Sequence, residues 1–173
     1  GYTSDAIAAV EWAIQHQSEH NIRVINMSLG HAPWEAAETD PLSMISRMAV
    51  DSGIVVVAAA GNIGQSEGEE VYGGITSPGI EPSVITVGAV TAWGTPSRSD
   101  DTVASYSSRG PTRYDEIIKP DITAPGTQIV APMSPGNILA AEYPQVVVDS
   151  NYMWLSGTSM SAPTVSAAVP LIL

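Results

Sequence analysis

Apolar positions recur with a helical period near the start of the chain. In "DAIAAVEWAIQHQSEH", residues 5–20, the side chains of Ile7, Val10 and Ile14 fall on one face of a helix. The residue before this segment, Ser4, is of a type that commonly caps helix N-termini. We therefore predict a helix over residues 5–20 with Ser4 as its cap.

Two further segments show helical patterns. A second helix is predicted for "PLSMISRMAVDSG", residues 41–53, because the leading proline suits a first turn and Gly53 suits the C-terminal stop. A third is predicted from about Ser159, with Pro163 in its first turn. Pro170 should kink or end that helix.

Extended segments alternate with these helices. Strands are predicted for residues 23–29, 54–60, 83–90, 103–106, 128–132 and 145–149, with 152–156 pairing with the last of these. The uninterrupted apolar run "IVVVAAA" indicates a strand that is buried on both faces. This alternation predicts an α/β fold with a mostly parallel sheet and right-handed crossovers, and residues 1–173 are expected to form a single domain.

Composition narrows the class of protein. Hydrophobic residues make up 44% and charged residues 14%, which is typical of a globular chain. Acidic residues outnumber basic ones by 18 to 6, so the surface should repel nucleic acid and anionic membranes and suits a secreted or surface-exposed protein. The longest apolar run is too short to span a membrane. The absence of cysteine excludes disulfides and thiolate catalysis.

The two ends of the chain lack the signals that usually close a domain. The opening "GYTSDAI" already has the pattern of a helix entry, and the closing "VPLIL" is apolar without a cap. Domains rarely stop inside an apolar helix. We therefore expect both ends to be cut from a larger protein.

The stretch "GTSMSAPTVSAA", residues 157–168, is the first candidate for chemistry. It places Ser159 and Ser161 in a glycine-led turn that enters a predicted helix. Free N–H groups and the positive end of the dipole meet at a helix start, where they can stabilise a developing oxyanion. Taken alone, such a serine-rich turn is more often a plain helix cap.

Two other stretches end predicted strands. "AAAGN", residues 58–62, brings Asn62 to the carboxyl end of the buried strand, where sites gather in parallel sheets. Its amide could donate into a site, or it could form an ordinary Asx turn. "NMSLG", residues 26–30, could pair along an open edge with an extended peptide, or could be a strand followed by a turn.

Together, and in this order, "NMSLG", "AAAGN" and "GTSMSAP" resemble the subtilisin-like serine proteases, the subtilases. "SPGIEPSVITVGAV", "SSRGP" and "KPDITAPGTQIVAP" support the resemblance, which runs from about residue 5 to residue 173. It implies a three-layer, doubly wound, subtilisin-like α/β fold that lacks its N-terminal segment. It also implies a serine endopeptidase that hydrolyses peptide bonds through an acyl-enzyme and requires no cofactor for the reaction.

The resemblance assigns roles to individual residues. It makes Ser159 the nucleophile, Ser161 part of the scaffold, and the Asn62 amide and the Ser159 N–H the oxyanion donors. The substrate-binding residues that it implies are Ser28, Leu29, Gly30, Ala59, Ala60 and Gly61. Their small size leaves room for a bulky apolar side chain before the scissile bond. The resemblance also implies a cis bond between Ser77 and Pro78.

The partners of the nucleophile are missing from the sequence. Subtilases place an Asp in a D-T/S-G motif and a His in an H-G-T/H motif before the serine, and neither motif occurs here. His16, His20 and His31 are the only histidines, and none matches the family's base. A serine without a base is a poor nucleophile. The isolated chain is therefore expected to be nearly inactive, with the Asp and His supplied by an absent segment.

Other interpretations and ligands follow from the same residues. A non-catalytic binding or assembly module is the alternative to a protease, whereas a Rossmann-like nucleotide binder is disfavoured because no G-x-G-x-x-G follows a strand. A half-domain should self-associate to cover its apolar surface. Subtilases often use calcium, and the candidate acidic ligands are Glu67, Glu69 and Glu70, although loop acids are more often solvated.

Overall fold

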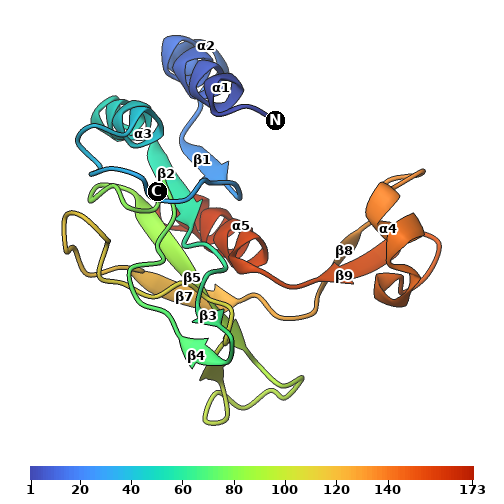
Figure 1. Cartoon of the computed structure of the whole chain (residues 1–173). Coiled ribbons are helices and arrows are strands. Elements are labelled where there is room, and N and C mark those ends of the chain that lie inside the picture. The colour runs from blue at the N-terminus through green and yellow to red at the C-terminus, as the bar shows by residue number, and fades with distance from the viewer.

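A twisted five-stranded sheet forms the centre of the molecule, whose residues 1–173 are all described by a computed structural model (Figure 1). Its strands are β1 (Val24–Met27), β2 (Val55–Ala59), β5 (Ile85–Thr91), β6 (Thr102–Val103) and β7 (Ile122–Pro125). β1, β2, β5 and β7 run parallel, and only β6 is antiparallel. The predicted α/β class with a mostly parallel sheet is confirmed.

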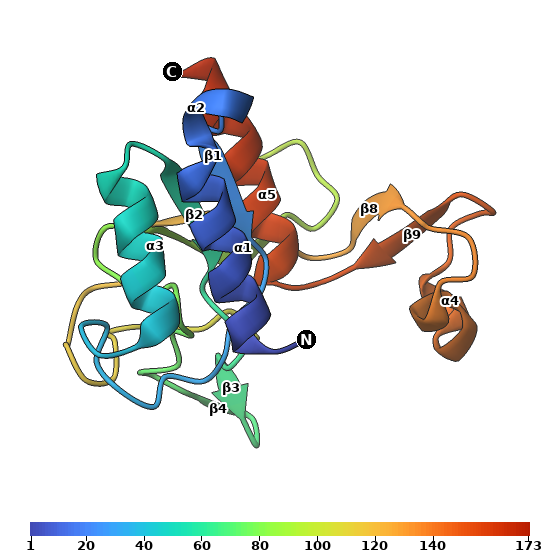
Figure 2. The ribbon, with the colours of Figure 1, turned by 90° about the horizontal axis from the view of Figure 1, so that it is seen from above.

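Helices cover both faces of this sheet (Figures 1 and 2). α1 (Thr3–Gln15) and α3 (Pro41–Asp51) pack on one face around a buried cluster that includes Leu42, Val56 and Ala58. α5 (Thr158–Ala168) packs on the other face, where Ala162 meets buried residues of β2, β5 and β7. The two separate cores show why the apolar run in β2 is continuous, since that strand is buried on both sides.

The first helix differs from the prediction at both ends. It begins at Thr3, so Ser4 lies inside the helix and the assignment of Ser4 as the cap is wrong. The helix also breaks at His16, after which a short helix α2 (Gln17–His20) ends on Asn21 in the left-handed conformation. The single predicted helix is therefore two.

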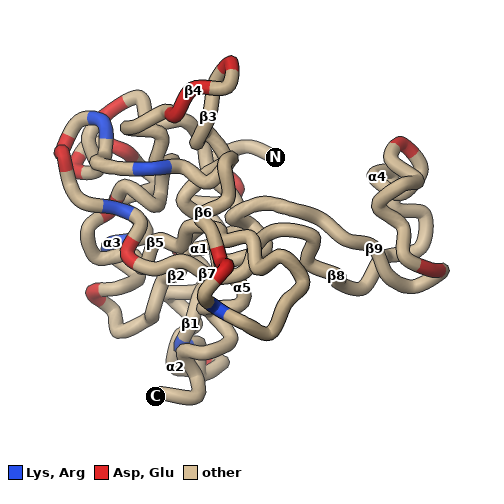
Figure 3. Tube along the Cα trace, turned by 90° about the horizontal axis from the view of Figure 1, so that it is seen from below, with Lys and Arg blue, Asp and Glu red and all other residues tan.

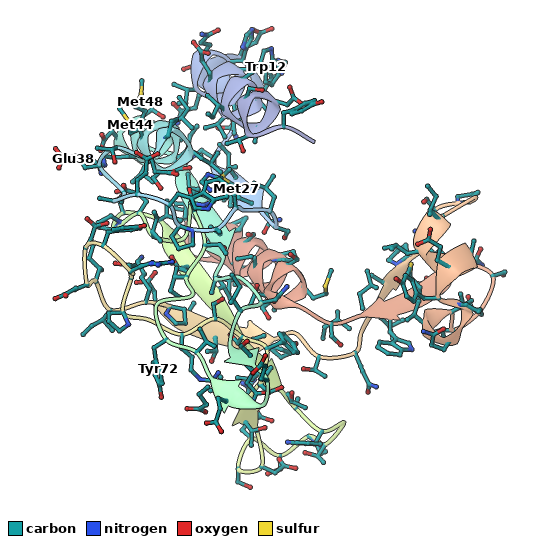
Figure 4. The ribbon with its side chains drawn as sticks, viewed as in Figure 1. Trp12, Met27, Glu38, Met44, Met48 and Tyr72 are labelled. Carbon is teal, nitrogen blue, oxygen red and sulfur yellow. The ribbon has the colours of Figure 1, made fainter.

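The second helix follows the prediction closely. The side chain of Asp40 accepts a hydrogen bond from the Ser43 N–H at 2.7 Å and caps α3. Gly53 follows the helix with φ +92°, a conformation that favours glycine. Met27, from β1, lies beneath this helix with its sulfur 3.7 Å from the Ser46 hydroxyl (Figure 4).

Between residues 126 and 157 the structure confirms the strands predicted at 128–132 and 152–156 but not the one at 145–149. Residues 145–149 do not form a strand: Pro144–Val146 makes a short 3-10 turn, η1, and the predicted pairing with 152–156 is limited to one antiparallel bridge between Val147 and Met153. All four residues of β9 (Tyr152–Leu155) instead pair antiparallel with β8 (Ile129–Pro132). β7 was not predicted from the sequence.

The same stretch forms an arm that stands away from the sheet and its helices (Figures 1 and 2). It contains β8, α4 (Ile138–Glu142), η1 and β9. The arm is closed where it leaves the body, because the Gly157 N–H donates to the Gly126 carbonyl at 2.9 Å. A second bond, from the Gln128 N–H to the Ser156 hydroxyl at 2.9 Å, lies next to the first.

Acidic residues are distributed along much of the chain and also occur on the arm (Figure 3). Within the predicted acidic loop, two short strands, β3 (Gln65–Ser66) and β4 (Glu69–Glu70), form a small hairpin. None of the helices is both long and apolar enough to cross a membrane.

Candidate active site

The N-terminal end of α5 presents one of its two candidate serines to the surface. The helix begins at Thr158, one residue before the predicted start, so Ser159 lies in its first turn. Ser161 is fully buried and donates to the Ala124 carbonyl at 3.0 Å. Ser159 therefore lies at the N-terminal end of the helix, and Ser161 anchors the helix to β7.

The side chain of Asn62 reaches this helix start from the end of β2. Its Oδ1 accepts hydrogen bonds from the Thr158 N–H at 3.0 Å and from the Thr158 hydroxyl at 3.1 Å. The Thr158 Oγ1 in turn accepts from the Gly61 N–H at 3.1 Å. This network assigns the amide oxygen inward and leaves the Nδ2 hydrogens free to donate. The side chain thus bonds to α5 rather than closing a local Asx turn.

Ser159 and Ser28 are joined by two hydrogen bonds. The Ser159 hydroxyl donates to the Ser28 carbonyl at 3.1 Å, and the Ser28 hydroxyl donates to the Ser159 carbonyl at 2.8 Å. That carbonyl has no helical partner, because residue i+4 is Pro163, which carries no N–H. Because Pro163 leaves this carbonyl free, the Ser28 hydroxyl can bond to it, and this bond connects the start of the helix to the segment that follows β1.

A pocket of about 300 Å³ opens beside Ser159. It is lined by Leu29, Gly30, Ala59, Gly61, Asn62, Thr76, Thr158 and Ser159. Four of the six expected substrate-binding residues line it. Ser28 contacts Ser159 instead. Ala60 is fully buried in a separate cluster with Ile75 and Ile80, so its side chain does not face the pocket.

Thr76 is the residue of this pocket that the sequence did not reveal. A Cβ on Gly61 would lie 2.6 Å from the Thr76 Cγ2, and one on Gly30 would lie 3.0 Å from its Oγ1. Both walls can therefore approach Thr76 only because they carry glycine. The bond between Ser77 and Pro78, next along the chain, is cis, as the resemblance implies.

No histidine lies within hydrogen-bond distance of the Ser159 hydroxyl, whose bond is to the Ser28 carbonyl. His16 stacks on Trp12, with ring centroids 4.4 Å apart, and its Nδ1 lies 2.9 Å from the Trp12 carbonyl. His20 lies beside Glu19 on the exterior. His31 has its Nε2 3.3 Å from Asp40. None of the three is placed to take the serine proton.

The acidic hairpin does not converge on a metal site. Nowhere do three or more His, Asp or Glu side chains gather so that they could hold a metal ion. Glu70 is engaged by Arg109, with a shortest N–O distance of 3.3 Å, and by the Tyr72 hydroxyl at 3.0 Å. This hydrogen bond and the negative charge of Glu70 raise the pKa of Tyr72. Tyr72 lies beside the hairpin (Figure 4).

A serine at a helix N-terminus, a fixed amide donor and a glycine-walled pocket together make the arrangement expected of a serine-nucleophile hydrolase. Comparison with known proteins places the chain more narrowly. The model of the Peptidase S8 (subtilase) family matches residues 1–173, and the chain therefore belongs to the subtilase family.

Individual relatives agree with this family. The chain is 41% identical to the serine protease AprX of Bacillus subtilis and 38% identical to subtilisin E of the same organism, and both matches cover 100% of it. Among solved structures, it is similar to the S41 psychrophilic protease (TM-score 0.74, 28% identity) and to sphericase (TM-score 0.73, 30% identity), with 99% of the chain covered in each.

The chain is shorter than these relatives. It spans 39% of AprX and 35% of subtilisin E. Of the solved S41 protease and sphericase chains it spans 50% and 49%. The fold described above is therefore compared with a part of each relative.

Proposed function

We propose that this chain is the C-terminal part of the catalytic domain of a serine endopeptidase, with Ser159 as the nucleophile. The observation that carries the proposal is the orientation of Asn62. Because Thr158 occupies the amide oxygen of Asn62 with two hydrogen bonds, the Nδ2 group is the part left to act as an oxyanion donor beside Ser159.

In this mechanism the Ser159 Oγ attacks the carbonyl carbon of the scissile peptide bond and its proton passes to a base. The carbonyl electron pair moves to oxygen, and the resulting oxyanion accepts bonds from the Asn62 Nδ2 and the Ser159 N–H. Collapse of this intermediate expels the amine, which takes the proton, and leaves an ester on Ser159. Water then hydrolyses the ester.

The base and its carboxylate partner are assigned to a segment of the longer protein that precedes residue 1. Within this chain the Ser159 hydroxyl faces only the Ser28 carbonyl, so residues 1–173 alone should react very slowly. The chemistry requires no cofactor because the nucleophile and the donors are protein groups. Any calcium ion would be structural and is assigned to the longer protein, not to the acidic hairpin.

The substrates proposed are peptides and proteins. The Ser28–Gly30 segment would pair with substrate backbone, while Leu29, Gly30, Ala59 and Gly61 would receive the side chain that precedes the scissile bond. We extend the proposal to a secreted or cell-surface enzyme with no nucleic-acid or membrane partner, since the net charge is −12.

A second candidate function is a non-catalytic binding or assembly module. The unaided hydroxyl of Ser159 favours it. β1 pairs only with β2, so its other edge is unpaired and could bind a second copy of the isolated chain. We therefore also propose that residues 1–173 self-associate. A strictly monomeric chain in light scattering at high concentration would contradict that part.

A fluorophosphonate probe separates the protease from the binding module. In the full-length protein we expect fast, stoichiometric labelling that is lost in Ser159→Ala and retained in Thr164→Ala, a matched change on the same helix. Ser159→Ala should also lower the turnover of a peptide substrate by about a millionfold. Unchanged proteolysis by Ser159→Ala would rule out the proposed nucleophile.

The same probe tests the missing base. In the isolated chain of residues 1–173 the labelling of Ser159 should be slower than in the full-length protein by at least about a thousandfold. Equal labelling rates in the two proteins would show that a base does lie within this chain.

A further inference from the structure

His31, the residue after Gly30, pairs with the buried Asp40, and nothing in the proposed chemistry uses this pair. Asp40 is 1% exposed, and its Oδ2 lies 3.3 Å from the His31 Nε2. The other ring nitrogen of His31, Nδ1, lies 2.9 Å from the Ala32 carbonyl. Both ring nitrogens face acceptors, so the doubly protonated ring satisfies both contacts, whereas either neutral tautomer satisfies one.

The backbone of His31 is hydrogen-bonded to the segment that carries Thr76. His31 follows Gly30, and its N–H donates to the Ser77 carbonyl at 3.2 Å while the Ser77 N–H donates to the His31 carbonyl at 3.0 Å. Ser77 follows Thr76, the pocket residue that packs against Gly30. This pair of bonds therefore holds the Gly30 and Thr76 segments together.

The side chain of Asp40 joins the same two segments, through Ser77 and His31. The Asp40 Oδ1 accepts from the Ser77 hydroxyl at 2.6 Å and from the Ser43 N–H at 2.7 Å, while its Oδ2 faces His31. One carboxylate thus contacts both segments and the start of α3. No other basic side chain lies within ion-pair distance of Asp40, so His31 is the basic partner of this buried carboxylate.

The surroundings of His31 hold its ring in place. The ring stacks on Trp34 with centroids 5.1 Å apart and planes 11° from parallel, and the side chain is 16% exposed. The arrangement cannot be a second catalytic triad, because the Ser77 hydroxyl is fully buried and donates to Asp40 rather than to the imidazole.

We infer that His31, acting through Asp40, is a positioning residue that holds Gly30 against Thr76 and so maintains the shape of the pocket that receives the side chain preceding the scissile bond. The inference rests on the proposed function of the pocket. His31 touches neither the nucleophile nor the oxyanion donors, so it should act on substrate binding and leave the chemical step unchanged.

The test is a set of variants in the full-length protease. In His31→Leu, which removes both donors, the KM for a peptide substrate should rise about tenfold and kcat should change by less than about threefold. In His31→Gln, whose amide can still donate to Asp40, KM should return to within about threefold of the original value. His20→Leu, a change at an exposed histidine, is the matched control and should leave both constants unchanged.

A second pair of variants covers the case in which His31→Leu does not fold. The Asn amide mimics Nδ1 and is too short to reach Asp40, so His31→Asn should show the raised KM that His31→Gln does not. A fall in kcat as large as the rise in KM, an unchanged KM in His31→Asn, or failure of Gln to restore KM would each overturn the inference.

Failure of this inference can be told from failure of the proposed function. A small fluorophosphonate has no peptide side chain to place in the pocket, so it should label Ser159 at the same rate in every His31 variant. Normal labelling with an unmoved KM would contradict only the role of His31. Retained proteolysis in Ser159→Ala would contradict the proposed function itself.

Discussion

In the proposed mechanism, the Ser159 site has its oxyanion donors in place but has no group that could accept the hydroxyl proton. On the oxyanion side, Asn62 is fixed by two bonds from Thr158, which is itself fixed by the Gly61 N–H. On the proton side, the hydroxyl has only the Ser28 carbonyl, which can accept a hydrogen bond but cannot take a proton. Under the proposed mechanism, the groups that would stabilise an oxyanion are brought together by the fold of residues 1–173, whereas the group that would activate the nucleophile is assigned to another segment of the longer protein.

The largest effect in this comparison is expected on the oxyanion side. Asn62→Ala in the full-length protease removes the free Nδ2 donor, and kcat should fall by about 10²–10³-fold because the donor acts on charge that exists only in the transition state. KM for the same peptide should stay within about twofold. Steady-state kinetics measure both constants. A rise in KM without loss of kcat would show that Asn62 binds substrate and is not an oxyanion donor.

A smaller loss of kcat is expected when the hydroxyl of Ser28 is removed. Ser28→Ala deprives the Ser159 carbonyl of its hydrogen bond, which Pro163 cannot replace, so the first turn of α5 loses its tie to the substrate-binding segment. An unmade bond of this kind costs about 1–3 kcal/mol, and kcat should fall by about tenfold. Ser99→Ala, at an exposed serine, is the control. An unchanged kcat for Ser28→Ala would show that the tie is dispensable.

The smallest effect is expected at Glu70 and Tyr72, which lie outside the Ser159 site. Glu70→Gln removes the charge that raises the pKa of Tyr72, so this pKa should move down toward its ordinary value. A raised tyrosine pKa stabilises the folded state at pH values below the unfolded pKa of about 10, and this contribution is lost as pH rises through the folded pKa. Ultraviolet titration of the phenol measures the shift.

The Glu70→Gln variant should keep its kcat. Glu70 bonds to Tyr72 and Arg109 and not to the residues that line the pocket. A fall in kcat would place the hairpin within the active site. An unmoved phenol titration would contradict the contact between Glu70 and Tyr72.

Much of this arrangement could be predicted from short sequence patterns. Pro41 and Gly53 bounded α3 because their backbone preferences are local. The continuous apolar run of β2 identified a strand buried on both faces. Ser159 could be distinguished from Ser161 by its position before Met and at the helix start, and the structure shows the second serine buried.

Other features depended on contacts between distant segments and could not be predicted. The main partner of β9 was missed because its pairing with β8 depends on how the arm folds back, and only one bridge, between Val147 and Met153, joins β9 to the predicted segment. Thr76 and Asp40 gave no signal, since an isolated threonine or aspartate has many ordinary uses. Their importance arises where residues about 40 positions apart meet, as Asp40 and Ser77 do.

The closed base of the arm has a consequence for how the molecule can vary. The bond between Gly126 and Gly157 fixes the start of α5 against the body without help from the residues in between. Because the cost of closing a loop grows only slowly with its length, this stretch can gain or lose residues with little effect on the helix start. The arm is thus a place where a partner-specific extension could be exchanged between related chains while Ser159 keeps its position.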